Sequence, residues 1–290
     1  MHPTARRERY RQVLSGTESI WVPGVFNAVS ARIAEEVGFQ VALLPGSAAA
    51  ATLLATPDLV LLTLSELATL ARQIVRATSL SVMVDADHGY GNALGVMRTV
   101  QELEAAGVSA LTLEDAVLPQ PFAPASPGAL ISIAEMQGKL RAALEAREDP
   151  SLVIIGRTNA LRSQGLPEAI KRAKAYEETG VDALLVVGLK KPEEFQALRE
   201  AVSLPLLSGA VSSPPGQPMD LAFFQKLGYR MILVPHLAIR VATRAVYETL
   251  QHLRQEGNPE ALAAQMIPTP LLDQILRKSY YTELGERFLR

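Results

Sequence analysis

The side chains best suited to chemistry in this sequence are acidic, and they follow short apolar runs. Asp85 and Asp87 come directly after the run SVMV, and Glu114 comes directly after ALTL. Residues two apart in an extended segment face the same side, so the two aspartates can act together. Three converging carboxylates repel one another unless a cation lies among them. Hard oxygen donors without cysteine indicate Mg²⁺, or alternatively Mn²⁺, unless one or two of these acids only cap helices or lie in loops.

Three further residues stand at comparable positions and could hold an anionic substrate. Arg157 follows the run VIIG and can bind a carboxylate through two parallel hydrogen bonds, although an ion pair with one of the acids would also explain it. His236 follows the last apolar run, a place that favours a role in a pocket. Ser47, after Pro45 and Gly46, offers a hydroxyl and a backbone N–H for a carboxylate or an oxyanion, or else caps the next helix.

Two neighbouring features are expected to support the acidic pair. His88 directly follows Asp87 and is interpreted as a hydrogen-bonding partner of the metal ligands. The segment 89–91, Gly-Tyr-Gly, lacks the third glycine and the later acid of a dinucleotide-binding motif, so we expect only a sharp turn there.

Strand ends would bring these residues together, and the sequence repeats the unit that creates them. Four times a helical segment ends at a glycine and a β-branched run follows, at Gly38, Gly107, Gly180 and Gly228. Glycine suits the left-handed position after a helix, and an apolar run suits a strand buried on both faces. Strands are expected at 20–25, 40–45, 81–85, 109–114, 152–156, 183–187, 203–207 and 230–234. Helices are expected at 28–37, 65–77, 93–106, 133–147, 167–179, 192–201, 219–227 and 237–255. Eight such units predict an α/β fold, a (β/α)₈ TIM-type barrel rather than an open doubly wound sheet, with the polar strand ends at one face.

No linker or change of composition divides the chain. Residues 1–255 are predicted to form one barrel domain with an N-terminal helix, and 256–290 a C-terminal extension that packs on the barrel or on a neighbouring subunit. The alanine-rich stretch 47–56 fits a packed loop or a helix. The proline-rich stretch 116–132 is expected to be a mobile lid or an ordered surface excursion, and 208–218 is similar.

Composition narrows the class of protein. The chain has 290 residues, 48% of them hydrophobic and 20% charged, which is typical of a globular protein. A net charge of −2 gives no electrostatic case for nucleic acid or an anionic membrane. The chain has no cysteine, which excludes disulfides and a cysteine nucleophile or acid. No signal peptide or membrane span is visible, and we expect a cytoplasmic protein.

Four motifs together resemble the isocitrate lyase/phosphoenolpyruvate mutase superfamily over about residues 15–255. They are LPGS (44–47), DADHGYGN (85–92), TLED (112–115) and GRTNA (156–160). The resemblance implies an α/β barrel, a Mg²⁺ site and a 2-oxo acid or its enolate as substrate or intermediate. It also implies a homotetramer, a dimer of dimers in which the last barrel helix is exchanged between subunits.

The resemblance also assigns roles to individual residues. Asp85 would ligate the metal directly. The ligands bound through water would be Asp58, Asp87 and Glu114. Ser47 and Arg157 would hold the substrate.

The loop after Asp115 separates the branches of the superfamily. The lyase branch carries a K-[KR]-C-G-H loop whose cysteine donates a proton, whereas this sequence reads EDAVLPQPFAPAS and has no cysteine. The mutase and phosphonopyruvate hydrolase branches carry lysine and asparagine in this loop, and 116–132 contains neither. The pattern L-P-x-x-F (118–122) and the single His236 resemble the oxaloacetate decarboxylase branch instead.

The resemblance therefore implies Mg²⁺-dependent decarboxylation of oxaloacetate, or of a close 2-oxo acid, to pyruvate and CO₂ through a metal-bound enolate. Arg157 and the amide of Ser47, next to Gly46, would stabilise the enolate, and His236 would polarise a substrate oxygen. The alternatives are a C–C bond lyase acting on a substituted malate or isocitrate-type acid, phosphonopyruvate-type P–C chemistry, and a non-enzymatic metabolite-binding barrel.

Overall fold

Eight parallel strands form one sheet in the computed structural model, which describes residues 2–120, 122, 128–209 and 219–289. The strands are β1 (Ile20–Pro23), β2 (Val41–Leu44), β3 (Ser81–Asp85), β4 (Ala110–Glu114), β5 (Val153–Thr158), β6 (Ala183–Val186), β7 (Leu206–Gly209) and β8 (Tyr229–Val234). Their order is β1-β8-β7-β6-β5-β4-β3-β2. The two end strands also meet, because the Val25 amide donates to the Leu43 carbonyl at 2.8 Å and Gly24 bridges Leu43. The predicted (β/α)₈ barrel is confirmed.

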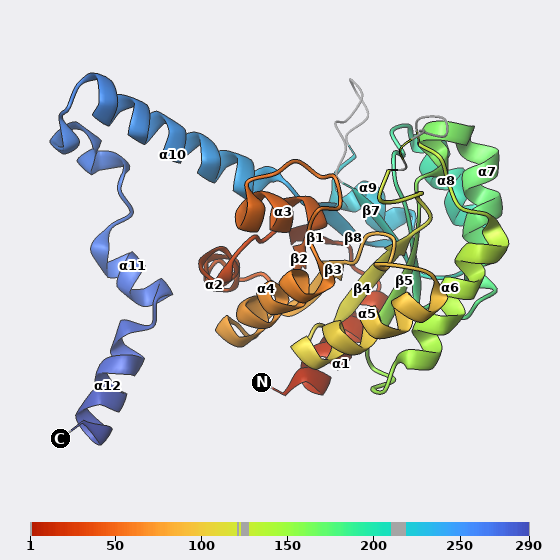
Figure 1. The fold of residues 1–290 in the computed structure, drawn as a ribbon, viewed down its shortest axis with the longest axis horizontal. Helices are drawn as coiled ribbons and strands as arrows, with labels where there is room; N and C mark the ends of the chain where they lie inside the picture. Colours follow the sequence, from red (N-terminus) through yellow and green to blue (C-terminus); the bar gives the residue numbers. More distant parts are fainter. Residues whose placement is uncertain (1, 121, 123–127, 210–218, 290) are drawn as a thin grey trace.

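Helices alternate with the strands and cover the outside of the sheet (Figure 1). They are α1 (Pro3–Ser15), α2 (Ala28–Glu36), α3 (Gly46–Leu54), α4 (Leu64–Ala77), α5 (Ala93–Ala106), α6 (Ile133–Ala146), α7 (Ala160–Glu177), α8 (Pro192–Ala201), α9 (Leu221–Lys226), α10 (Leu237–Gln255), the 3₁₀ helix η1 (Pro259–Gln265), α11 (Thr269–Ile275) and α12 (Lys278–Phe288). Within the described residues, no helix is long and apolar enough to cross a membrane.

The repeated glycines end helices as the sequence predicts. Gly107, for example, has φ +88°, and its amide donates to the carbonyls of Leu103 and Glu104 at the end of α5. The buried run Ala110–Glu114 then forms β4. The local pattern therefore sets the helix-to-strand junction, and burial on both faces stabilises the strand that follows.

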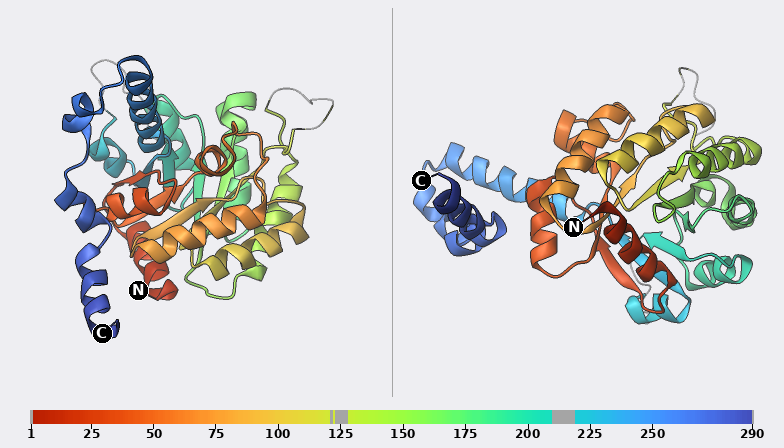
Figure 2. Two further views of the ribbon diagram at one scale, coloured as in Figure 1. Left: turned by 60° about the vertical axis from the view of Figure 1, so that its left-hand side comes forward. Right: turned by 90° about the horizontal axis from the view of Figure 1, so that it is seen from below.

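Two apolar clusters hold the barrel together. The larger lies between the sheet and the helices, and the smaller fills the barrel interior with strand residues such as Val41, Met83 and Met231. Tyr10 and Leu14 of α1 belong to the interior cluster, so α1 plugs the amino-terminal end of the barrel. Figure 2 shows α1 across that end when the barrel is seen from below.

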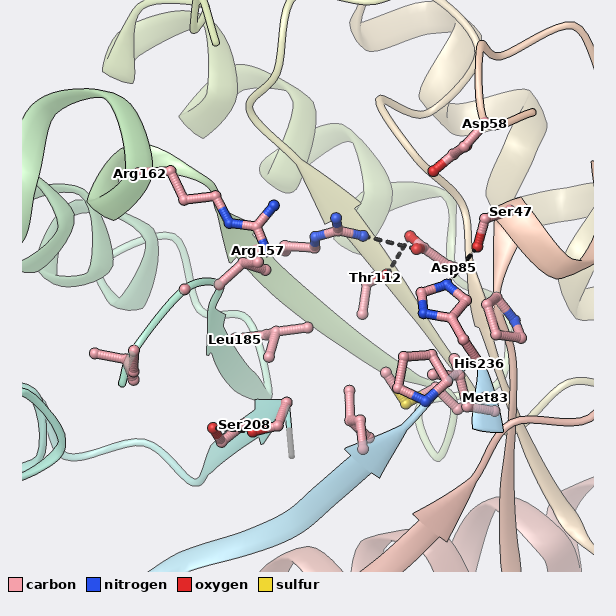
Figure 3. A pocket seen from close by; sticks show the side chains of 18 of the residues that line it. Ser47, Asp58, Met83, Asp85, Thr112, Arg157, Arg162, Leu185, Ser208 and His236 are labelled. Atoms are coloured by element: carbon pink, nitrogen blue, oxygen red, sulfur yellow. Dashed lines mark hydrogen bonds and ion pairs between the residues drawn. The ribbon is translucent and has the colours of Figure 1, made fainter. Parts of the chain in front are cut away.

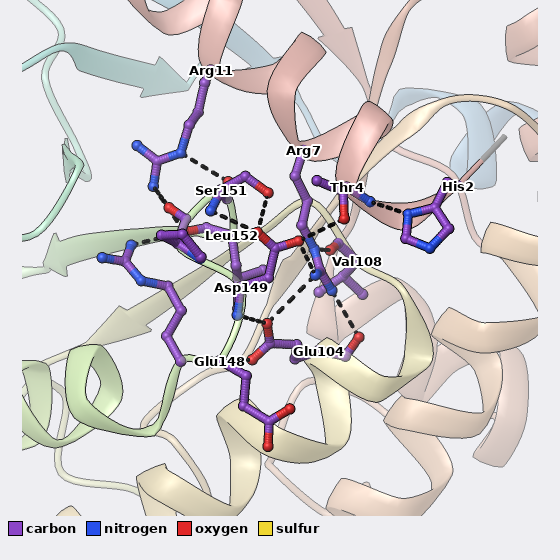
Figure 4. A network of polar contacts seen from close by, with 12 residues as sticks. His2, Thr4, Arg7, Arg11, Glu104, Val108, Glu148, Asp149, Ser151 and Leu152 are labelled. Carbon is purple, nitrogen blue, oxygen red and sulfur yellow. Dashed lines mark hydrogen bonds and ion pairs between the residues drawn. The ribbon is translucent and has the colours of Figure 1, made fainter.

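Arginines on α1 hold this helix in place through hydrogen bonds to backbone carbonyls. Arg6 donates to the Thr78 carbonyl at 2.6 Å, Arg7 to the Val108 carbonyl at 3.0 Å, and Arg11 to the Ser151 carbonyl at 2.9 Å. These carbonyls belong to the connections before β3, β4 and β5, and the contacts to Val108 and Ser151 lie in the network drawn in Figure 4. The amino-terminal end is therefore closed by a charged, hydrogen-bonded helix.

Some element boundaries differ from those predicted. The strand expected at 203–207 begins at Leu206, because Pro205 precedes it and lacks an N–H for the sheet. The helix expected at 167–179 is the second part of α7, which begins at Ala160 and is interrupted by Gly165 at φ +84°. The alanine-rich stretch forms α3, so of the two alternatives the helix is correct.

The chain after β8 leaves the barrel. Helix α10 has no buried residue, and in Figures 1 and 2 it projects away from the strands. The chain then turns back, and α11 lies beside α2, where Arg277 pairs with Glu35 at 3.1 Å and Gln274 bonds to Glu36. The C-terminal extension thus contacts this barrel at α2 through α11 and Arg277, and the position expected for an eighth covering helix is not filled by α10 of the same chain.

Candidate active site

A cavity of about 720 Å³ opens at the carboxyl ends of the strands. Its lining includes Ser47, Asp58, Asp85, Arg157 and His236 (Figure 3). Ser47, Asp85, Arg157 and His236 lie at or just after the ends of four different strands, as expected for a barrel whose active groups gather at this face, and Asp58 lies between α3 and α4.

Arg157 lies between two of the predicted carboxylates. Its guanidinium is 2.7 Å from Asp85 Oδ2 and 2.6 Å from Glu114 Oε2. Register explains the second contact, since Glu114 and Arg157 are partners across β4 and β5. Burial alone lowers the pKa of Arg157, but the charges of Asp85 and Glu114 outweigh it and raise that pKa above its usual value. Of the two interpretations, the ion pair with the acids is observed.

Asp87 is buried beside this group in a strained turn. Its φ of +47° is in the left-handed region, which aspartate tolerates better than most residues. Burial, followed by the charges of Asp85 and Glu114, raises the pKa of Asp87 to about 8. Gly46 leaves room for it, because a Cβ on Gly46 would lie 2.8 Å from Asp87 Oδ1. Gly46 is thus needed for the close approach of its backbone to the carboxylate.

Asp58 and Glu114, the other two predicted metal ligands beside Asp85 and Asp87, also lie where a negative charge is disfavoured. Burial and the charge of Asp85 raise the pKa of Asp58. Burial also raises the pKa of Glu114, which the nearby Arg157 only partly offsets. Across the described part of the chain, no three His, Asp or Glu side chains converge tightly enough to hold one metal ion as direct ligands.

Ser47 and His236 form a pair on the opposite side of Asp85 from Arg157 (Figure 3). Ser47 Oγ is 2.8 Å from His236 Nε2. Ser47 is the second residue of α3, and Pro45 holds the N-cap position without a side-chain bond, so the capping interpretation of Ser47 is wrong. The amides of the first helical turn have no partner within a helix, and Ser47 therefore brings both a hydroxyl and an N–H to the cavity wall.

His88 is near the site but turned to other partners. Its carbonyl accepts from Lys139 Nζ at 3.0 Å, and its ring lies 5.8 Å from that of Tyr90. Burial, followed by the charge of Lys139, lowers the pKa of His88 to about 4. The side chain is therefore neutral at ordinary pH, and no hydrogen bond of its ring to Asp85 or Asp87 is found among the described contacts.

A buried residue without a predicted role positions the end of β5. Asp115 is fully buried and accepts hydrogen bonds from Thr158 Oγ1 at 2.6 Å and from Tyr176 OH at 2.7 Å. It also accepts from the Asn159 amide at 3.0 Å and pairs with Arg172 at 3.1 Å. The contacts fix the backbone directly after Arg157. The TLED motif pointed to this residue, but only the fold reveals its partners.

Four other polar residues complete the site without having been predicted. Thr112 donates to Asp85 Oδ1 at 3.0 Å from the neighbouring strand, and Asn159 donates to Glu114 Oε2 at 2.8 Å. Arg162 and Lys190 line the cavity. Sequence reasoning missed these last two because they come one turn after Asn159 and two residues after Gly188, beyond the strand ends.

The predicted lid falls partly outside the described residues. At its base, Val117 N donates to the Ala129 carbonyl at 2.9 Å and Ile131 N to the Asp115 carbonyl at 2.9 Å. Residues 121 and 123–127 of the predicted lid lie outside the described residues, as do residues 210–218 of the similar stretch predicted at 208–218.

Sequence comparison identifies relatives over nearly the whole chain. Residues 11–254 match the family described as phosphoenolpyruvate phosphomutase. A protein of Rhodopseudomonas palustris (strain HaA2) named oxaloacetate decarboxylase is 46% identical over 284 residues, which cover 98% of this chain and 96% of the relative.

Solved structures of similar fold belong to enzymes with several activities. Phosphonopyruvate hydrolase in complex with oxalate and Mg²⁺ has a TM-score of 0.87 and 29% identity, with full coverage of both chains. Oxaloacetate acetylhydrolase in complex with the inhibitor 3,3-difluorooxaloacetate has a TM-score of 0.86 and 28% identity, covering 99% of this chain and 98% of the other. Fold similarity of this kind spans more than one reaction, so the choice of reaction depends on the site.

Proposed function

Because the chain belongs to the phosphoenolpyruvate phosphomutase family, we propose that it is a Mg²⁺-dependent carboxy-lyase that converts oxaloacetate, or a close 2-oxo acid, to pyruvate and CO₂. The observation that carries the proposal is one cavity that joins Asp85, Arg157 and the Ser47–His236 pair in a chain without cysteine. The relative at 46% identity, which is named for this reaction, supports the choice.

The donor set fits a hard divalent cation. Asp58, Asp85, Asp87 and Glu114 offer only oxygen atoms, which Mg²⁺ prefers. Asp58, Asp87 and Glu114 have a raised pKa because they are at least partly shielded from solvent and lie near like charges, and a cation would relieve that repulsion. We propose that Asp85 is the direct ligand and that the other three act through water, with Mn²⁺ as a possible substitute. When bound, the ion supplies Lewis acidity to the 2-oxo group.

The chain's own residues would hold the substrate and the developing charge. As the C3–C4 bond breaks, CO₂ leaves and its bonding electrons move towards the C2 oxygen. Arg157 supplies positive charge beside that oxygen, and the Ser47 amide and hydroxyl donate hydrogen bonds to it. His236, held by Ser47, orients the substrate and polarises the same oxygen. These interactions strengthen as charge accumulates, so they favour the transition state over the ground state.

A substrate panel tests the reaction. Purified protein is incubated with Mg²⁺ and, separately, with oxaloacetate, isocitrate, methylisocitrate, 2,3-dimethylmalate and phosphonopyruvate. Pyruvate is measured by a coupled lactate dehydrogenase assay, and phosphonate cleavage is followed by phosphorus NMR. We expect turnover of oxaloacetate above the spontaneous rate with Mg²⁺ and no turnover with EDTA. Turnover of another substrate alone would replace the proposal with a C–C lyase or a P–C bond enzyme. Binding without any turnover would indicate a metabolite sensor.

His236→Gln examines the role of the Ser47–His236 pair. We expect a lower kcat or a higher KM for oxaloacetate, with the Mg²⁺ dissociation constant little changed, because His236 is not among the proposed ligands. His2→Gln, at the exposed start of α1 at the other end of the barrel, is the matched control. Loss of Mg²⁺ binding in the His236 variant would contradict this division of roles.

The exposed helix α10 leads us to propose an oligomer. Its exposed apolar residues include Leu237, Val241, Tyr247 and Leu250, which would cost less free energy if they packed on a second copy. We propose a homotetramer in which α10 is exchanged between subunits. Light scattering should show about four times the chain mass, and Val241→Asp combined with Leu250→Asp should reduce it. A monomeric wild-type protein at micromolar concentration would contradict this proposal.

A further inference from the structure

The cavity has opposite charges on its two sides. Asp58, between α3 and α4, and Asp85, at the end of β3, line it on one side, whereas Arg162 and Lys190 line it after β5 and β6. In the strand order, β6 is three strands from β3, so Lys190 and Asp85 lie on different sides of the barrel mouth. Figure 3 shows Arg162 on the side of the cavity away from Asp58 and Ser47.

Two glycines, Gly165 and Gly188, determine where the side chain of Arg162 lies. It belongs to the first turn of α7, which Gly165 separates from the rest of the helix at φ +84°. Its side chain lies over Gly188, where a Cβ would be 3.0 Å from Arg162 Cγ and 3.3 Å from Arg162 Nε. Gly188 has φ +103°, a conformation that other residues rarely adopt. The backbone at Gly188 thus forms a platform for the stem of Arg162.

Neither cation is neutralised by a carboxylate. In contrast to Arg157, the side chains of Arg162 and Lys190 have no hydrogen bond or ion pair with any described residue. Glu194, which lies next to Lys190, accepts hydrogen bonds from the backbone amides of Lys190 and Lys191 and does not pair with the Lys190 ammonium group. The internal residues that the structure does not describe, 121, 123–127 and 210–218, include no Asp or Glu that could pair with them. Two unpaired cations at one wall of a cavity create a positive potential that attracts an anionic group.

We propose that Arg162 and Lys190 form a subsite for the second carboxylate of a dicarboxylic 2-oxo acid. This proposal rests on the proposed function, and it specifies the substrate class. The 2-oxo acid end of the substrate would lie towards Asp85, and the second carboxylate would point to the two cations. A guanidinium binds a carboxylate through charge-assisted hydrogen bonds, so a monocarboxylic acid would forgo these contacts.

The reaction itself predicts which kinetic constant the subsite affects. The second carboxylate is the group that leaves as neutral CO₂ when the C3–C4 bond breaks, and the electron pair moves to the C2 oxygen. Negative charge therefore moves away from Arg162 and Lys190 in the transition state. The subsite stabilises bound substrate at least as well as the transition state, and its removal should raise KM without lowering kcat.

Two variants and a turnover-independent binding assay test the subsite. For Arg162→Gln and Lys190→Gln, we expect KM for oxaloacetate to rise about ten-fold, with kcat unchanged or higher. In calorimetric titrations with Mg²⁺, the variants should bind 3,3-difluorooxaloacetate about ten-fold more weakly. Affinity for oxalate, which has no group beyond its chelating pair of carboxylates, should stay within about two-fold of wild type.

Matched controls separate the subsite from general charge effects. Lys171→Gln removes an exposed cation from the same helix, outside the cavity lining, and should leave both ligands unaffected. Arg162→Lys should retain part of the affinity for 3,3-difluorooxaloacetate. Equal weakening of oxalate and 3,3-difluorooxaloacetate, a fall in kcat, no effect of either variant, or a wild type that does not bind 3,3-difluorooxaloacetate would overturn the subsite. Selective binding of 3,3-difluorooxaloacetate by a wild type that does not decarboxylate oxaloacetate would overturn the proposed function and leave the subsite standing.

Discussion

Carboxylates at the two ends of the barrel experience opposite environments. At the amino-terminal end, Asp149 accepts hydrogen bonds from Thr4 at 3.0 Å and from Arg7 at 2.7 Å, and from both the amide and the hydroxyl of Ser151 (Figure 4). Burial opposes its charge, but the bonds from Ser151 and Arg7 outweigh it and hold the pKa of Asp149 well below its usual range. At the carboxyl end, Asp87 is surrounded by other carboxylates, and its pKa is raised.

The two ends of the barrel differ in what their charged residues do: at one end they stabilise the fold, and at the other we interpret them as part of the active site. At the amino-terminal end, arginines of α1 match the acids of the connections, and the network stabilises the fold. At the cavity, Asp58, Asp85, Asp87 and Glu114 face one well-placed arginine, Arg157. Such an excess of negative charge in a partly buried site costs stability, and we interpret it as the preparation of a site for a cation that binds from solution.

The largest expected difference between substitutions at the two ends of the barrel is in catalytic activity. Asp85→Ala should reduce Mg²⁺-dependent pyruvate formation by roughly 1000-fold or more, because it removes the proposed direct ligand. Steady-state assays with oxaloacetate measure this. Asp149→Asn, at the other end of the barrel, is the control and should retain activity. An active Asp85→Ala variant would sink the metal assignment.

The next effect concerns stability at the amino-terminal end. Arg7 is 5% exposed and pairs with Glu104 and Asp149, so Arg7→Met should lower the free energy of unfolding by about 3 kcal/mol. Urea denaturation measures the change. Arg98→Met is the matched control, because Arg98 is exposed and pairs only with Glu102 on the same helix, and it should change stability by less than about 0.5 kcal/mol. Equal effects of the two variants would remove the contrast between a buried and a surface pair.

At the cavity, removing a charged group should have the opposite effect and stabilise the metal-free protein. The raised pKa of Asp87 means that the folded protein favours its neutral form, so the cost of its charge appears above the unfolded value near 4 and grows until about pH 8. Asp87→Asn should therefore raise the free energy of unfolding in EDTA at pH 8 by about 1–3 kcal/mol. The gain should vanish near pH 4. Denaturation across this range measures it, and a less stable variant at pH 8 would contradict the interpretation.

The smallest expected effect is the acid dependence of Asp149. Its lowered pKa contributes stability that is present above the unfolded value near 4 and is lost as pH falls towards the folded value. Asp149→Asn should cost about 1 kcal/mol at pH 7, and the difference from wild type should shrink below pH 4. Thermal unfolding at pH 7, 4 and 2.5 follows this trend. A difference that is independent of pH would mean that packing, and not charge, accounts for the effect.

Much of the site was predictable because it lies where strands end. Asp85, Glu114, Arg157 and His236 each end or follow an apolar run, and the barrel collects those ends in one region. Ser47 was located correctly but its capping interpretation was wrong, because Pro45 ends the strand-to-helix connection and α3 begins at Gly46. Asp58 was assigned only through the resemblance, since it lies in a connection without a regular pattern.

Other parts could not be read from a local pattern. Asp115 was only the last residue of the TLED motif, and its role comes from Thr158, Tyr176 and Arg172, which are far along the chain. The departure of α10 from the barrel was also invisible to periodicity, because an amphipathic helix has the same sequence pattern whichever sheet it covers.

The sequence alone determined the repeating helix-to-strand unit, and with it the barrel and the face on which the acids gather. Hydrophobic period and glycine position are local properties, and eight apolar runs, four of them introduced by a glycine that ends a helix, leave few topologies. Tertiary structure alone decided the pairings: Arg157 between Asp85 and Glu114, Ser47 with His236, and Arg162 over Gly188. Such pairings depend on strand register, side-chain rotamers and the space left by a missing Cβ, which are fixed only when segments distant in the chain pack together.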